Sequence, residues 1–346
     1  KRIKLFREAC KRQGLNKNKV KESIQRLKKA KIIVIGDIIV DEYAACEAIG
    51  MSAEAPVVVV KELKTKEFIG GAGIVAAHVR ALGADCDLIT VVGNDSTGRV
   101  VQEKIKENKI GGRIIVDNSR PTTYKKRYIV GNQKLFRVSR LEEKKIDSCL
   151  EEKIINQLRE CAINADGIIV SDFVYGLVTD KILNEICQLA VEHDIKLFGD
   201  LQCSSQVGSI TRFKNFTLLC PNEKEARLAL QDKDSGLEQI SRRLIKITNT
   251  KSLIMKLGSE GFIAYDEQKG AVNMKKSEAF PALSINPLDV TGAGDSLLAV
   301  MATGISTDVE LMHMAAVGCC MTALAVETMG NTPIGSYELD KKVEEV

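Results

Sequence analysis

The chain has 346 residues, of which 45% are hydrophobic and 28% charged, a composition typical of a globular protein that buries a core. It contains no tryptophan and no apolar run near the roughly 20 residues of a membrane span, so we expect no membrane partner. Its ten cysteines form no CxxC pair and complete no zinc pattern, which favours a reducing, cytoplasmic location.

Residues 1–31 carry most of the positive charge. They contain 13 Lys and Arg against two Glu, so this segment has a charge of +11 and the rest of the chain −7. A basic arm can bind nucleic acid, but this one has a single Phe and no recognised nucleic-acid motif, which argues against that partner. We predict a basic helical extension over residues 1–30, in two helices that pack on the main body. The apolar residues that recur at helical spacing are Ile3, Leu5, Phe6, Ala9, Val20, Ile24 and Leu27.

Residues 31–346 have the rhythm of one α/β domain. A buried strand is expected at 31–35, and helical and strand patterns alternate regularly from residue 150 onward. Two β-rich segments, 44–68 and 113–139, flank a helical unit and can pair as one small sheet. We therefore predict a doubly wound, mostly parallel sheet with a small β-sheet lid.

The motif DVTGAGDS, followed at once by an apolar stretch, is the most informative part of the chain. It predicts a tight turn at the N-terminus of a buried helix, where unpaired amides and the helix dipole bind anions such as phosphate. Gly292 and Gly294 lack the Cβ atoms that would hold a phosphate away. A general base for a hydroxyl that attacks phosphorus would explain the carboxylate of Asp295 beside this site. An N-cap aspartate in an ordinary glycine turn is the alternative.

Two further polar clusters fall where strands are expected to end. Asp37 and Asp41 follow the first strand and can accept hydrogen bonds from two sugar hydroxyls, although each can also be a turn or N-cap residue. Gly70 and Gly71 lead into a predicted helix, where bare backbone can approach a ligand. An ordinary glycine-rich turn is the alternative there.

Taken together, these motifs resemble those of the ribokinase-like carbohydrate kinases, also called the PfkB family. The order GDxxxD, Gly-Gly turn, NxxE and GAGD is the same, and the resemblance covers roughly residues 31–340. It implies an ATP-dependent sugar kinase that uses Mg²⁺, with Asp295 as the base and the amides of Gly292, Ala293 and Gly294 around the transferred phosphoryl group. Asn222 and Glu225 would hold the metal, through water. The full set of nucleotide-binding residues implied is Asn222, Glu223, Lys224, Glu225, Lys256, Gly258, Gly261 and Thr291.

Within this family the resemblance is greatest to the kinases of D-glycero-β-D-manno-heptose 7-phosphate, on the strings GDIIVDEY, SAEAPV and TTYKKR. It implies an anomeric hydroxyl as acceptor and a 1,7-bisphosphate product on the route to ADP-heptose. A solvated basic strand edge is the alternative for the cations near the sugar site. The substrate-binding residues implied are Asp37, Asp41, Gly70, Gly71, Lys125, Arg127, Arg137 and Asp172.

Four residues depart from the pattern of those heptose kinases. Ile74 stands in place of an Asn, Gly50 in place of an Arg, and Tyr175 and Gln202 in place of lysines. Each change removes a polar or cationic group from the expected sugar site. A kinase for another small sugar or nucleoside, and a non-catalytic sugar- or nucleotide-binding relative, are therefore the alternatives. Because exposed lid strands often pair between subunits, we also expect a homodimer that forms through the lid.

Overall fold

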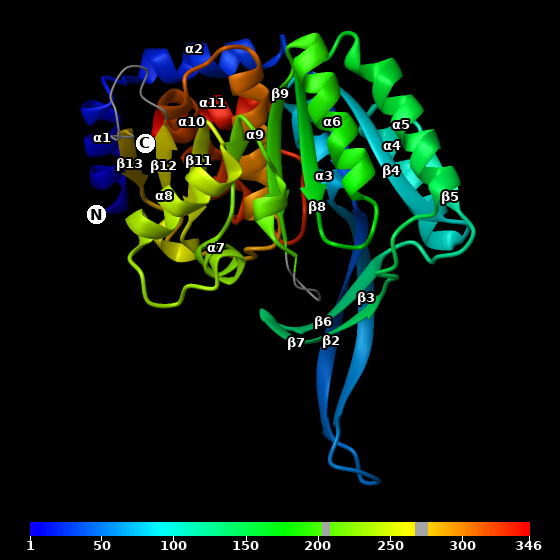
Figure 1. The fold of residues 1–346 in the computed structure, drawn as a ribbon. Helices are drawn as coiled ribbons and strands as arrows, with labels where there is room; N and C mark the ends of the chain where they lie inside the picture. Colours follow the sequence, from blue (N-terminus) through cyan, green and yellow to red (C-terminus); the bar gives the residue numbers. More distant parts are fainter. Residues whose placement is uncertain (203–207, 267–275) are drawn as a thin grey trace.

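A computed structural model describes residues 1–202, 208–266 and 276–346. In that part of the chain, nine strands form one sheet in the order β13-β12-β11-β10-β9-β8-β1-β4-β5 (Figure 1). The seven strands from β11 to β5 in this order run parallel, whereas β12 pairs antiparallel with both β11 and β13. This confirms the doubly wound, mostly parallel sheet. The strands are β1 Lys31–Gly36, β4 Asp85–Gly93, β5 Ile114–Asp117, β8 Gly167–Asp172, β9 Lys196–Leu201, β10 Leu218–Leu219, β11 Ser252–Lys256, β12 Phe262–Asp266 and β13 Lys276–Phe280.

Helices cover both faces of this sheet, so the central strands are buried on two sides and read as continuous apolar runs. One layer consists of α5 Ser148–Ala162, α6 Asp180–His193, α7 Glu223–Leu230 and α8 Leu237–Thr248. The other consists of α2 Lys17–Leu27, α3 Ala72–Ala81, α4 Ser96–Glu107, α9 Ala293–Ser306, α10 Leu311–Ala325 and α11 Ser336–Glu345, with α1 Arg2–Arg12 beside β13. Short 3₁₀ turns occur at Ile210–Arg212 and Gly258–Glu260.

The two N-terminal helices belong to the main hydrophobic core. Phe6 and Ala9 of α1 are buried, as are Ile24 and Leu27 of α2. All four pack in the same apolar cluster as α9 and α10. The apolar stripe of α1 therefore faces β13 and that of α2 faces α9, α10 and α11, as expected of amphipathic helices.

A second sheet projects from the large one (Figure 1). Its strand order is β3-β2-β6-β7, in which β2 pairs with β6 in parallel and the two outer pairs are antiparallel. The part of the 113–139 segment before residue 118 differs from the expectation for a lid. Its strand β5 pairs with β4, because the apolar run at 114–116 extends the edge of the large parallel sheet. The strands of the small sheet are β2 Ile38–Met51, β3 Val58–Gly71, β6 Tyr124–Val130 and β7 Gln133–Arg140.

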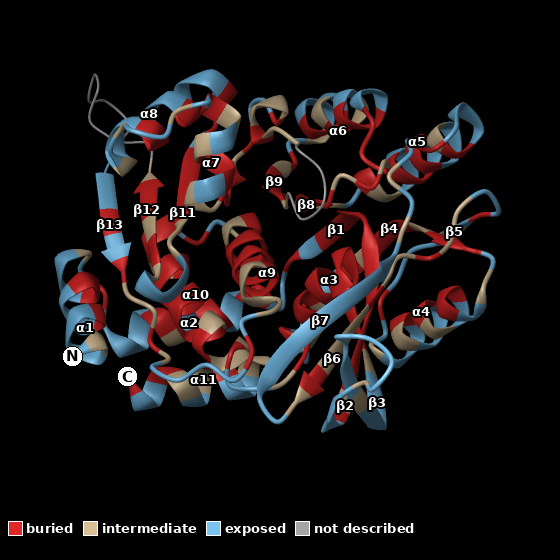
Figure 2. Ribbon diagram, turned by 90° about the horizontal axis from the view of Figure 1, so that it is seen from below, coloured by how far each residue is buried: buried red, intermediate tan, exposed pale blue. Residues whose placement is uncertain are grey.

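The small sheet is much more exposed than the large one. Figure 2 shows β7 and the outer parts of β2 and β3 as exposed. Apolar side chains on these strands that lie largely in solvent are Ile49, Met51, Val58, Leu63, Leu135, Phe136 and Val138. Among the described residues, no helix is long and apolar enough to span a bilayer.

Candidate active site

The DVTGAGDS motif forms a tight turn at the start of α9. Gly292 caps the helix with a φ of 80°, and a Cβ on it would lie 2.1 Å from Asn331 Oδ1, so only glycine fits. Among the hydrogen bonds of the described residues, none uses the N–H of Gly292 or Gly294, whereas the Ala293 N–H donates to the Val290 carbonyl at 3.3 Å. Two of the three expected amides are therefore available for an anion at the positive end of the helix.

Asp295 lies in the first turn of the same helix and is buried, with 5% of the residue exposed. The Gln202 Nε2 donates to its Oδ1 at 3.1 Å. Burial and the neighbouring Asp200 carboxylate raise the pKa of Asp295 to about 7, while Lys256 acts in the opposite direction. A carboxylate with this pKa can take up a proton near neutral pH, as a general base must.

A buried ion pair lies beside the turn. Lys256, at the end of β11, donates to Oδ2 of Asp200, at the end of β9, at 2.7 Å. The Lys256 Nζ is 3.3 Å from the position that a Cβ on Gly294 would occupy. No motif in the sequence contains Asp200. The signal that points to it is its place at the carboxyl end of a buried parallel strand, where ligands of α/β sheets gather.

Asn222 and Glu225 form a capping box at the N-terminus of α7. The Glu225 N–H donates to Asn222 Oδ1 and the Asn222 N–H donates to Glu225 Oε2, each at 2.8 Å. Burial raises the pKa of Glu225 to about 7, although Lys256 opposes this rise. The NxxE motif is therefore a local structural signal as well as a source of a carboxylate near the ion pair.

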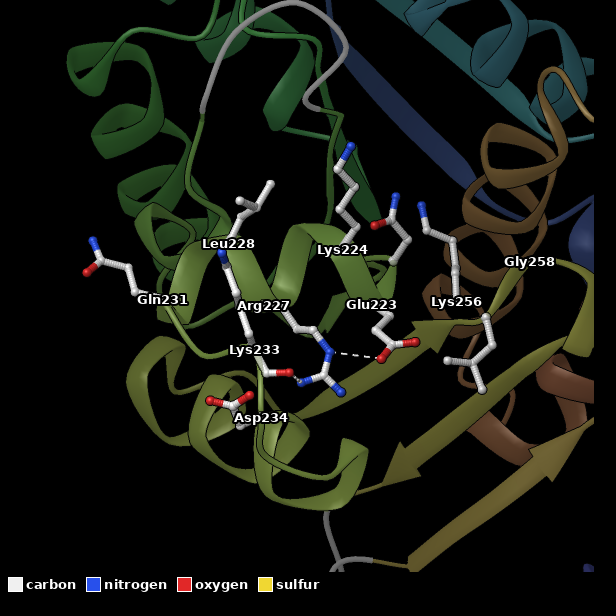
Figure 3. A pocket seen from close by; sticks show the side chains of 11 residues that line it. Glu223, Lys224, Arg227, Leu228, Gln231, Lys233, Asp234, Lys256 and Gly258 are labelled. Carbon is white, nitrogen blue, oxygen red and sulfur yellow. Dashed lines mark hydrogen bonds and ion pairs between the residues drawn. The ribbon is translucent and has the colours of Figure 1, made fainter.

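Two cavities lie next to Lys256. The larger, of about 890 Å³, is lined by α7 and the loop that follows it, together with Lys256 and Gly258 (Figure 3). Lys224 lines it, and Glu223 accepts a hydrogen bond from Arg227 at its wall, at 2.8 Å. The second, of about 480 Å³, has mainly apolar walls and includes the backbone of the Gly294 turn. Other expected nucleotide-binding residues on this second cavity are Gly258 and Gly261.

A buried carboxylate joins the small sheet to the glycine turn. Asp289 accepts hydrogen bonds from Tyr43 Oη at 2.5 Å and Lys134 Nζ at 2.7 Å, both on the small sheet. It also accepts hydrogen bonds from the backbone N–H groups of Thr291 at 3.0 Å and Gly330 at 3.1 Å. Burial alone would raise the pKa of Asp289, but the bonds from Lys134 and Tyr43 hold it at about 2. Thr291 is thus fixed by its contact with Asp289.

Asp41 makes a second link of this kind. Its carboxylate forms an ion pair with Arg127 of β6 and accepts a hydrogen bond from Asn331 Nδ2 at 3.3 Å. A Cβ on Gly70 would lie 2.5 Å from Asp41 Oδ2, which explains the glycine there. Because Asn331 also covers Gly292, the expected sugar-binding carboxylate and the turn share one contact.

Asp37 organises the loop that follows β8. Its Oδ2 accepts the backbone N–H of Phe173 at 2.9 Å and of Tyr175 at 3.3 Å. Burial and the Asp172 charge raise the pKa of Asp37 to about 7. Gly71 has a φ of 58°, and a Cβ on it would lie 2.2 Å from the Asp37 carbonyl oxygen. The GDxxxD and Gly-Gly motifs are thus adjacent in space.

The remaining sugar-site candidates are in different environments. Lys125 is 3% exposed, and its Nζ lies 5.4 Å and 5.3 Å from the ring centres of Phe173 and Tyr175. Its charge also lowers the pKa of Asp295, so Lys125 belongs to the same electrostatic environment.

Asp172 and Arg137 differ from each other in burial and in their partners. The Asp172 carboxylate accepts hydrogen bonds from the Val174 N–H at 2.8 Å and from Arg212 at 3.2 Å, and burial raises its pKa. Arg137 is exposed on β7, in register with Arg127. Asp172 thus stabilises the loop after β8 through its bond with Val174, and Arg137 faces solvent.

Known proteins resemble the chain over nearly its whole length. The model of the pfkB family carbohydrate kinases matches residues 29–335. The chain belongs to the pfkB family of carbohydrate kinases. The Bifunctional protein HldE of Campylobacter jejuni is 31% identical to this kinase over 314 residues, and that of Citrifermentans bemidjiense is 26% identical over 334 residues. These matches cover 90% and 95% of the kinase but only 64% and 66% of the relatives, so the chain spans just under two thirds of their length.

Solved structures share the fold of the kinase. Phosphofructokinase-2 from Escherichia coli in complex with potassium has a TM-score of 0.73 and 14% identity, over 92% of the kinase and 99% of that chain. Arabidopsis thaliana ribokinase complexed with ribose and ATP has a TM-score of 0.69 and 18% identity, over 91% of the kinase and 99% of that chain. Membership of a kinase family implies the use of ATP.

The four departures from the heptose-kinase pattern have unlike surroundings in this kinase. Gln202 contacts the Asp295 carboxylate directly. Tyr175 is buried beside Phe173, close to the Lys125 ammonium. Ile74 lies fully buried in α3 as part of the core, and Gly50 is on the exposed outer part of β2. Gln202 and Tyr175 are therefore the two departures next to charged groups of the site.

Proposed function

We propose that this kinase transfers the γ-phosphoryl group of ATP to a sugar hydroxyl at the N-terminus of α9. The observation that carries the proposal is a buried carboxylate, Asp295, whose pKa is raised to about 7. It lies in the same helical turn as the Gly294 amide, which donates to no acceptor among the described residues. Asp295 takes the proton of the acceptor hydroxyl, whose oxygen bonds to the γ-phosphorus as the bond to the bridging oxygen of ADP breaks. General-base catalysis of this kind contributes on the order of 10²–10⁴-fold.

The glycine turn supplies the electrostatic part of the reaction. Amides at Gly292 and Gly294 point toward charge that develops on the phosphoryl oxygens, and each well-placed donor of this kind is worth about 3–4 kcal/mol. Lys256 adds a fixed positive charge beside Gly294. Because these groups are held by the fold before substrate binds, little reorganisation accompanies the reaction.

Magnesium fits the acidic groups near Lys256. The described residues contain no cluster of three metal-binding side chains, but Asp200 Oδ1 is buried without a hydrogen-bond partner among them. Mg²⁺ is commonly held by one or two carboxylates together with water and substrate phosphates. Asp200 and Glu225, with Asn222 beside them, would hold the ion through water. When bound, the ion would neutralise charge on the phosphates of ATP.

We propose D-glycero-β-D-manno-heptose 7-phosphate as the acceptor, phosphorylated at its anomeric hydroxyl to give the 1,7-bisphosphate. The relatives named HldE at about 30% identity support this acceptor. So does the placement of Lys125 and Arg127 on β6 beside Asp41, where cations can bind a sugar phosphate. Asp41 and Asp37 would orient the sugar hydroxyls.

A kinase for another small sugar is favoured by two contacts. Arg127 is already paired with Asp41, and Gln202 provides a neutral amide beside Asp295. A sugar without a phosphate would leave these pairs intact.

ATP consumption measured with a sugar panel tests the proposals together. Turnover with heptose 7-phosphate that exceeds turnover with unphosphorylated sugars by at least tenfold supports the proposed acceptor. The reverse preference overturns that acceptor but keeps the kinase. Nucleotide and sugar binding without turnover on any sugar would instead identify a non-catalytic relative.

We also propose a homodimer formed through the small sheet, because its exposed strands carry large apolar side chains such as Val58, Leu63 and Phe136. Sedimentation of the wild type should give a dimer at micromolar concentration, and Phe136→Asp should give a monomer. Val191→Asp is the matched control, since Val191 is exposed on α6 instead. A monomeric wild type contradicts the proposal.

A further inference from the structure

The basic N-terminal segment is tied to the strand that leads into the apolar cavity. Arg12 and Gln13 bind the Glu278 carboxylate of β13, at 2.9 Å for Arg12 Nη2 and 2.8 Å for Gln13 Nε2. The α1 helix packs along β13 through its buried Phe6 and Ala9. Residues 281–285 and Pro287, which follow β13, form one wall of the cavity of about 480 Å³. The extension therefore lies against that wall.

Several cationic side chains of the segment have partners within the fold. Arginine and lysine side chains of α1 and α2 donate to backbone carbonyls near the C-terminal ends of helices and to acidic groups of α11. These four cations therefore have a structural role in the packing of the two helices. The pairs are Arg7 with the Val346 carbonyl, Lys17 with the Glu344 carbonyl, Lys21 with the Glu344 carboxylate and Arg26 with the Thr307 carbonyl.

Arg2 is the cation of the segment that reaches the cavity. Its guanidinium donates a hydrogen bond to the Ser284 carbonyl, and Arg2 itself lines the cavity. The same cavity is bounded by Phe262, Leu283 and Gly294, so it runs from the glycine turn to the N-terminal helix. Its mostly apolar walls suit an aromatic base, whose face attracts a guanidinium.

We propose that Arg2 is a nucleotide-binding residue and that the N-terminal extension completes the pocket for the base of ATP. The inference rests on the proposed function, in which the phosphates lie at Gly292 and Gly294. With the phosphates there, the base extends into this cavity toward Ser284. Arg2 then has two roles: it holds the Ser284 carbonyl and presents its guanidinium face to the base.

Binding of the non-hydrolysable analogue AMP-PNP with Mg²⁺, measured by titration calorimetry, tests the assignment without any sugar. Arg2→Ala should weaken binding about three- to thirty-fold, the range expected for one cation–π contact and one hydrogen bond. Arg2→Lys keeps the charge but loses the planar guanidinium, so its affinity for AMP-PNP should lie between those of the wild type and Arg2→Ala. Lys4→Ala is the matched control, because the Lys4 side chain is 83% exposed on the same helix, and it should bind as the wild type does.

The steady-state constants give a second readout. In Arg2→Ala, the KM for ATP should rise by a similar factor while the KM for the sugar stays within twofold. An unchanged affinity in Arg2→Ala, with binding intact in the wild type, overturns the role of Arg2 alone. Failure of the wild type to bind AMP-PNP overturns the proposed function as well. An equal loss in Arg2→Ala and Lys4→Ala would show a general effect of charge and would also overturn the assignment.

Discussion

Replacing Asp295 by asparagine should make the protein more stable and much less active at the same pH. Asparagine has almost the same shape, and its side-chain oxygen can still accept the hydrogen bond from Gln202. What it removes is a buried negative charge. In the wild type, burial and Asp200 raise the pKa of this carboxyl from 3.8 to about 7.

The sign and size of the stability effect follow from proton linkage. A raised pKa means that the folded protein binds a proton more tightly than the unfolded chain, so the wild type loses stability as the pH rises from about 4 through about 7. This difference in pKa between the folded and unfolded states corresponds to about 4 kcal/mol above pH 7. Asp295→Asn has no such loss. Its advantage over the wild type should therefore grow from pH 5 to pH 8 and then stay constant.

Urea unfolding at pH 5 and pH 8, together with ATP turnover at pH 8, measures both effects. Turnover should fall on the order of 10²–10⁴-fold. Asp308→Asn is the control, because Asp308 is exposed and its contact with Lys196 lowers its pKa, so no gain at high pH is expected. If Asp295→Asn is no more stable than the wild type at pH 8, the claim that the ionised, buried Asp295 destabilises the wild type is wrong. Turnover close to that of the wild type would refute the role of Asp295 as base.

Three other predictions concern the pH profile, the glycine turn and the link to the small sheet. The kcat/KM of the wild type should rise with pH through about 7 and then level off, because Asp295 must be deprotonated to act as base; a profile flat from pH 5.5 to 8 would contradict this. Gly292→Ala should lower both turnover and the melting temperature, since its φ of 80° and the position of Asn331 Oδ1, 2.1 Å from an added Cβ, exclude that atom. Gly236→Ala, where nothing lies within 4 Å, should leave turnover unchanged. Lys134→Ala removes one donor to Asp289 and should raise the pKa of that carboxyl above about 2 and speed hydrogen exchange in β7; exchange as slow as in the wild type would show that the ion pair does not hold the small sheet.

The sequence alone determined the architecture and the position of the glycine turn, because both are written in local patterns. Apolar runs that alternate with helical patterns indicate parallel strands, and DVTGAGDS indicates a tight turn before a helix, in which the structure places Gly292 in the left-handed conformation. NxxE is also a local pattern: it predicts the start of a helix, and in the structure Asn222 and Glu225 form the capping box of α7.

Tertiary structure decided which side chains share an environment. Asp200 lies in no motif, yet it pairs with Lys256 and shifts the pKa of Asp295, from strands far apart in the sequence. Arg2 reaches the Ser284 carbonyl across 282 residues of chain. The raised pKa of Asp295 depends on burial and on neighbours brought in by separate strands, so no local pattern could encode it. Strand order and packing, which are set by long-range contacts, placed these groups beside the turn.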